Sequence, residues 1–62
     1  MALDQWREIG PGQKVRLFRP NGEGYYGIVD DCSHDGAYIW VLTVESGRKL
    51  FHVNDGFQIT SP

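Results

Sequence analysis

The 62-residue sequence predicts an all-β fold, a small barrel of five antiparallel strands preceded by a short N-terminal helical turn. Two observations support this prediction. Eight glycines are spread along the chain, most of them between short apolar runs, as expected where a chain reverses or a strand bends sharply. Several of these runs alternate apolar and polar residues with a period of two, which is typical of strands that bury one face.

The segment before the first strand, residues 1–11, has helical spacing instead. Leu3, Trp6 and Ile9 recur every three residues, and a Gly-Pro-Gly sequence at 10–12 ends the pattern. A helix this short is unstable by itself in water. We therefore expect it to be held by packing of Trp6 onto the barrel.

Five strands are expected in the rest of the chain, residues 12–60. Turn-rich segments separate them, and Asp35-Gly36 is the strongest reversal signal. A single tight turn at 53–56 precedes the last strand. In chain order the expected strands are 13–18, 25–30, 37–44, 48–53 and 57–60. Their inward faces predict a core of Val15, Leu17, Val29, Ile39, Val41, Phe51, Val53 and Ile59.

Composition limits the possible classes of protein. The length suits one domain, residues 1–62, and the single cysteine, Cys32, allows no internal disulfide and is compatible with a reducing cytosol. No apolar run is long enough to cross a membrane and no secretion signal is recognisable, so we expect a cytoplasmic location. The net charge of −2 is unlike the basic balance that general nucleic-acid binders usually carry.

Two glycine–valine motifs resemble those of known small barrels. Gly12-Gln13-Lys14-Val15 followed by residues 24–29, Gly-Tyr-Tyr-Gly-Ile-Val, is similar to the cadence of KOW motifs and equally to that of Tudor-like domains. Both belong to the SH3-like barrels, and the resemblance covers roughly residues 12–60. The ALYDY motif and tandem tryptophans of signalling SH3 domains are absent, since Trp40 stands alone.

The resemblances imply different partners. A Tudor-like domain would hold a methylated cation in an aromatic cage, for which Tyr25, Tyr38 and Phe57 are the candidates. A KOW-like domain would bind nucleic acid. Residues 15–20, followed by Tyr25-Tyr26, also resemble small barrel subunits of photosynthetic electron-transfer complexes, which implies a ferredoxin-docking accessory subunit.

No arrangement of residues indicates catalysis or a cofactor. No nucleophile with its base, phosphate loop or carboxylate pair has the required spacing, so we expect a protein that is not an enzyme. Cys32 and His34 would need Asp35 and a fourth ligand to hold zinc, and we expect no metal site. Asp30 and Asp31 are consecutive in a strand and are expected on opposite faces.

The surplus of outward-facing apolar residues predicts a binding surface. Tyr26, Tyr38, Trp40 and Leu42 lie opposite the residues expected in the core, so something must cover them or they stay exposed. One interpretation is a second small core, in which Trp6 and Leu3 cover this face. The other is a surface for another protein or for self-association, because aromatic residues supply large contact area at low entropy cost.

The first strand carries the alternative, a nucleic-acid surface. Lys14, Arg16 and Phe18 share its outer face, and Arg19 follows directly. Basic residues beside an aromatic ring would follow a phosphate backbone and stack on a base. A solvated strand face explains the same residues, since Glu23, Asp30 and Asp31 are expected nearby.

Overall fold

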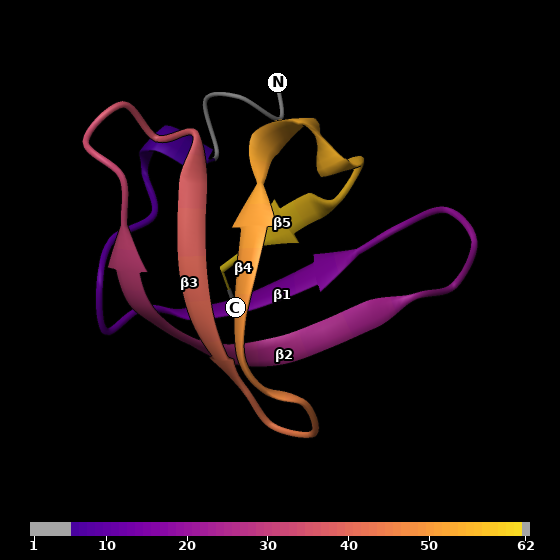
Figure 1. The fold of residues 1–62 in the computed structure, drawn as a ribbon. Coiled ribbons are helices and arrows are strands. Elements are labelled where there is room, and N and C mark those ends of the chain that lie inside the picture. The colour runs from indigo at the N-terminus through magenta and orange to yellow at the C-terminus, as the bar shows by residue number, and fades with distance from the viewer. Residues whose placement is uncertain (1–5, 62) are drawn as a thin grey trace.

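A computed structural model of the chain describes residues 6–61. They form one antiparallel sheet of five strands, which confirms the all-β prediction (Figure 1). The elements are β1 (Lys14–Phe18), β2 (Gly24–Cys32), β3 (Tyr38–Thr43), β4 (Gly47–His52), the 3-10 turn η1 (Val53–Asp55) and β5 (Gln58–Thr60). The strand order is β4-β3-β2-β1-β5, so β5 returns to pair with β1.

The sheet is strongly bent but is not closed into a barrel. In Figure 1, β3 and β4 cross β1 and β2. Among residues 6–61, β4 pairs only with β3, and β5 only with β1. At the end of β4 the backbone N–H of His52 donates to the Asp55 carboxylate (3.0 Å), and the His52 ring accepts from the Asn54 N–H (3.0 Å). These two bonds cap the start of η1. Because the His52 N–H is bound by Asp55, it is not available to a strand that would close the barrel against β4.

Gly27 of β2 lies in close contact with β3. A Cβ atom at this position would clash with the backbone carbonyl of Leu42 and would lie 2.7 Å from Cγ1 of Val41. Real Cβ atoms essentially never come this close to their neighbours, so only glycine fits without a shift of the backbone. The glycine of the sequence motif is therefore needed for strand packing.

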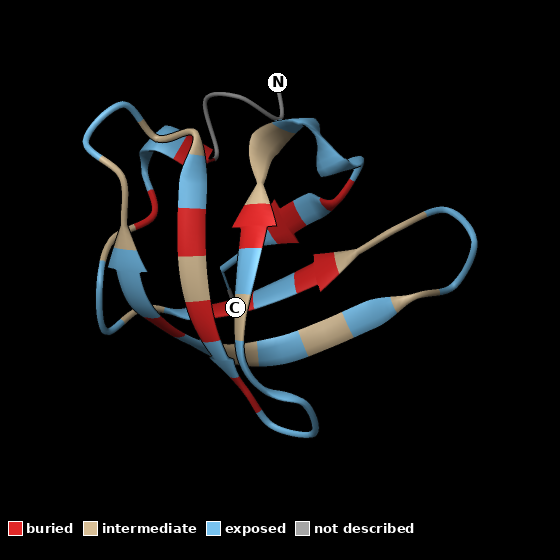
Figure 2. Cartoon of the chain, in the orientation of Figure 1, coloured by how far each residue is buried: buried red, intermediate tan, exposed pale blue. Residues whose placement is uncertain are grey.

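The core lies on the inner face of the bent sheet, where buried and exposed residues alternate along the strands (Figure 2). Its buried side chains are Trp6, Ile9, Val15, Leu17, Val29, Ile39, Val41, Phe51, Phe57 and Ile59. Every predicted core residue except Val53 is among them. Val53 is only partly buried because η1 begins there, and the alternation of strand β4 ends one residue earlier.

The N-terminal helical turn is not confirmed. Leu3 lies outside the described residues, and only the end of this segment is described: Trp6 and Arg7 have helical backbone, and the Ile9 N–H then donates to the Trp6 carbonyl (3.3 Å). Trp6 itself is 1% exposed and belongs to the inner core. No helix in the described part of the chain is long and apolar enough to cross a membrane.

Candidate protein-binding surface

A continuous apolar strip crosses the outer face of β2, β3 and β4. The strand register places Ile28 opposite Leu42, and Trp40 opposite Leu50. Tyr26 extends the strip at one end and Tyr38 at the other. We call this surface the outer strip, made of Tyr26, Ile28, Tyr38, Trp40, Leu42 and Leu50.

The strip is exposed, although its residues are as apolar as those of the core. Tyr26 is 58% exposed and Leu42 48%, whereas Val41, the neighbour of Leu42 in β3, is fully buried. Successive side chains of a strand point to opposite faces of the sheet. Because the bend encloses only the inner face, the outer residues are left without a covering layer from the strands themselves.

All of the partner-binding residues predicted from the sequence, Tyr26, Tyr38, Trp40 and Leu42, lie on the outer strip. The structure adds two more residues. Ile28 shares the outward face of β2 with Tyr26 and is 44% exposed. Leu50 is 45% exposed because it is next to the buried Phe51, and the same alternation in the sequence was sufficient to find it.

Trp40 is the most covered residue of the strip, because a cation lies on its ring. The guanidinium carbon of Arg48 is 4.1 Å from the ring centroid of Trp40. Nε of Arg48 also donates to the Asp30 carboxylate at 2.8 Å. The ion pair with Asp30 thus places the Arg48 guanidinium over this ring, where the cation–π contact is favourable. The uncovered part of Trp40 lines a hollow of about 300 Å³ with Tyr38, Leu50 and Asp31.

Trp6 does not cover the outer strip. Its side chain is buried among the inner core residues, on the opposite side of the sheet. The interpretation in which Trp6 covers this face as part of a second small core is therefore wrong. The other residue of that prediction, Leu3, lies outside residues 6–61.

The predicted nucleic-acid residues are only partly brought together. Lys14, Arg16 and Phe18 share the outer face of β1, and the Arg16 guanidinium lies 4.9 Å from the Phe18 ring and 5.7 Å from that of Tyr26. Arg19 is directed elsewhere: it pairs with Glu23 at 3.2 Å and lies 4.2 Å from the Phe57 ring. Arg19 therefore does not join Lys14 and Arg16 in a common phosphate-binding surface.

The three aromatic residues considered for a cation cage do not converge. Tyr25 packs edge-on against Phe57, with ring centroids 5.9 Å apart, and against Phe51. Tyr38 lies on the outer strip and packs against His52 at 4.5 Å. Tyr25 and Tyr38 are thus on opposite faces of the sheet, so one ligand cannot contact both.

The turn that follows Cys32 at the end of β2 holds His34 and is organised by hydrogen bonds to Asp35. The Asp35 carboxylate accepts from the Ser33 hydroxyl (2.7 Å) and from the Ala37 N–H (3.0 Å). Both bonds lower the pKa of Asp35, and the bond from Ser33 has the larger effect. Within the described residues, no group of three or more histidine, cysteine or acidic side chains is placed to hold a metal ion.

Comparison of the chain with protein-family models, with curated proteins and with solved structures finds no match.

Proposed function

We propose that this chain is a non-catalytic binding module, an SH3-like barrel in type, that takes a partner protein on its outer strip. The strand order and the 3-10 turn before the last strand support the SH3-like resemblance of the glycine–valine motifs. The observation that carries the binding proposal is the continuity of the exposed apolar side chains across three neighbouring strands.

The strip has the composition of a protein interface. It combines tyrosine and tryptophan with aliphatic residues, and polar groups surround it, Lys14 and Arg16 along one side and Asp31 at the far end. Covering one large apolar side chain is favourable by roughly 1.5–3 kcal/mol before the cost of association. A few such residues are sufficient for specific binding when they are contiguous.

The test compares two lysine substitutions on the same face of the sheet. Leu42→Lys places a charge in the middle of the outer strip, whereas Gln58→Lys places the same charge on β5, outside it. Proteins captured by the wild-type chain would be purified, and the affinity of each would be measured with all three chains. We expect Leu42→Lys to weaken binding by about ten-fold or more and Gln58→Lys to leave it unchanged.

Sedimentation of the three chains over a range of concentrations distinguishes a foreign partner from a second copy. A concentration-dependent dimer that Leu42→Lys abolishes would make the partner a second copy of the chain. Equal affinities for the wild-type and Leu42→Lys chains, with the fold intact by NMR and no dimer, would rule out the outer strip as the binding surface.

A second candidate function, nucleic-acid binding, is favoured by one observation. Arg16 lies between the rings of Phe18 and Tyr26, and Lys14 is next to it on β1. This combination would contact a phosphate while a base stacks on Phe18. It ranks second because Arg19 and Arg48 pair with the chain's own carboxylates, which leaves few cations on this face.

Titration of labelled single-stranded and duplex RNA and DNA at two salt concentrations tests this candidate. With two phosphate contacts to a single strand, the slope of log affinity against log salt is expected near −1.4, at about −0.7 for each contact. Arg16→Ala should reduce the slope by one contact. Absence of binding at low salt, or an Arg16→Ala chain that binds like the wild type, would contradict it.

A further inference from the structure

β2 extends beyond the end of β3, and this leaves part of its edge free. The Arg19 N–H donates to the Glu23 carbonyl (2.8 Å), and the Val29 N–H donates to the Gln13 carbonyl (2.9 Å). Odd-numbered residues of β2 therefore bond toward β1. Because bonding sides alternate along an antiparallel strand, the N–H and C=O groups of Gly24 and Tyr26 point to the β3 side.

Only one of these N–H and C=O groups of Gly24 and Tyr26 makes a hydrogen bond on the β3 side. The Val44 N–H donates to the Tyr26 carbonyl at 2.9 Å, and the chain then turns away through Glu45 and Ser46. Among the described residues, neither the Tyr26 N–H nor the backbone of Gly24 has a hydrogen-bond partner on this side. Free strand edges of this kind pair readily with another extended segment.

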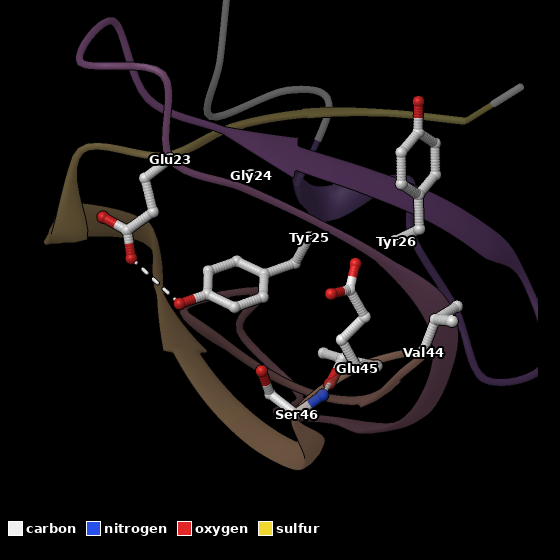
Figure 3. Close-up of a pocket in the computed structure, with 8 residues that line it drawn as sticks. Glu23, Gly24, Tyr25, Tyr26, Val44, Glu45 and Ser46 are labelled. Carbon is white, nitrogen blue, oxygen red and sulfur yellow. Dashed lines mark hydrogen bonds between the residues drawn. The ribbon is translucent and has the colours of Figure 1, made fainter.

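The free edge opens into a pocket of about 650 Å³ (Figure 3). It lies between the start of β2 and the turn that joins β3 to β4. Its lining residues are Glu23, Gly24, Tyr25, Tyr26, Thr43, Val44, Glu45 and Ser46. The turn is well held, because the Thr43 hydroxyl accepts from the Ser46 N–H (3.0 Å) and donates to the Gly47 carbonyl (2.6 Å).

The charges that line the pocket are both negative. One oxygen of Glu23 accepts from Arg19 (3.2 Å) and the other from the Tyr25 hydroxyl (2.9 Å). The hydrogen bond from the Tyr25 hydroxyl to Glu23 raises the pKa of Tyr25, and partial burial and the negative charge of Glu23 raise it further. Lys49 lies 5.3 Å from the Tyr25 ring but does not line the pocket. Glu45 is exposed and enters no ion pair among residues 6–61, so its charge is free to meet a cation.

We propose that this pocket is a second binding site, which takes an extended basic peptide segment of a partner as an added strand on the free edge of β2. The backbone of the segment bonds to Gly24 and to the Tyr26 N–H, and a lysine or arginine side chain reaches Glu45. Strand addition supplies affinity through the main chain, and the acidic turn supplies the preference for a basic side chain. The site does not depend on the outer strip, although Tyr26 borders both.

Amide NMR of the whole chain tests the site with a defined probe. The probe is a short capped peptide of valine and threonine with one central lysine. Two matched peptides serve as controls: one has glutamate in place of the lysine, and the other is N-methylated along its backbone. We expect the lysine peptide to shift the amides of residues 24–26 and 44–46, and both control peptides to bind at least about three-fold more weakly.

A matched pair of variants tests the role of the turn carboxylate. Glu45→Gln should weaken binding of the lysine peptide by about two- to five-fold, as expected for an exposed ion pair. Glu8→Gln removes the same charge from an exposed site outside the pocket and should leave the affinity unchanged. Absence of shifts at excess peptide, equal binding of the N-methylated peptide, or equal affinities of the two variants would each overturn the proposal.

Discussion

The two faces of the sheet contain similar side chains but have opposite environments. Val41 and Leu42 are neighbours in β3, yet Val41 is fully buried and Leu42 is 48% exposed. On the inner face the bend brings residues from all five strands into one cluster with Trp6. On the outer face the same bend spreads the side chains apart. Apolar character alone therefore does not identify the core of this domain, whereas position relative to the bend does.

Cations lie over aromatic rings on both faces of the sheet. On the outer face, Arg16 and Arg48 lie on the rings of Tyr26 and Trp40, so aromatic surface that is left open to solvent is partly covered by the chain's own cations. Two cations also lie over rings of the inner side: the Arg19 guanidinium is 4.2 Å from the ring of the core residue Phe57, and the Lys49 ammonium is 5.3 Å from that of Tyr25, which packs against the core. A partner that occupies the outer strip would meet these guanidinium groups as well as apolar side chains.

The largest expected difference between the faces comes from the same substitution at neighbouring positions. Val41→Asp buries an unpaired charge, which costs several kcal/mol. A domain of this size is stable by only about 3–9 kcal/mol, so we expect the variant to be largely unfolded by circular dichroism. Leu42→Asp places the same charge in water and should change the free energy of unfolding by about 0.5 kcal/mol or less. Similar stabilities for the two variants would contradict the assignment of the faces.

Gly27 tests the close contact between β2 and β3 that the bend requires. Gly27→Ala forces a Cβ atom against the Leu42 carbonyl and Val41, and such overpacking costs about 1–3 kcal/mol or more. Gly10→Ala is the control, because its Cβ would meet no atom within 4 Å and its φ is not in the left-handed region. Urea denaturation should show a lower midpoint for Gly27→Ala alone. Equal midpoints would show that the strands can separate here without cost.

Thr43 tests the turn that ends the outer strip and forms one wall of the pocket. Thr43→Val keeps the shape of this buried side chain but removes its bonds to Ser46 and Gly47, which should cost about 1–2 kcal/mol. Thr60→Val on β5 is the matched control at an exposed position, and thermal unfolding compares the two. A Thr43→Val chain as stable as the Thr60→Val chain would mean that water replaces these bonds at no cost.

The smallest expected effect is at the exposed turn between β2 and β3. Because hydrogen bonds hold the pKa of Asp35 below its ordinary value, this group stabilises the fold above its unfolded pKa and loses that contribution as the pH falls below about 4. Ser33→Ala removes the largest cause, so the pKa of Asp35 should rise toward its ordinary value in an NMR titration. An unchanged pKa in this variant would assign the shift to the Ala37 N–H instead.

Much of the fold followed from local pattern. The period-two alternation predicted every strand to within two residues at either end, and it assigned Val15, Leu17 and Val41 to the core. It also assigned Tyr26 and Leu42 to the outer face. Alternation is a property of the extended backbone, so it can be read from neighbouring residues without knowledge of the rest of the chain.

The features that local pattern missed depend on residues far apart in the sequence. Trp6 packs in the inner core. The Arg19 guanidinium lies over the Phe57 ring, which is close to it only because β5 pairs with β1. The free edge of β2 exists because β3 is the shorter strand, and no single segment shows this.

The sequence by itself determined which residues alternate in each strand, where the chain turns, and which charges and rings are present. The tertiary structure decided that Trp6 and Phe57 join the core, how far the sheet closes, and which charges are left without a partner. The physical reason is range: backbone conformation depends on adjacent residues, whereas burial and pairing depend on the bend and register of the whole sheet.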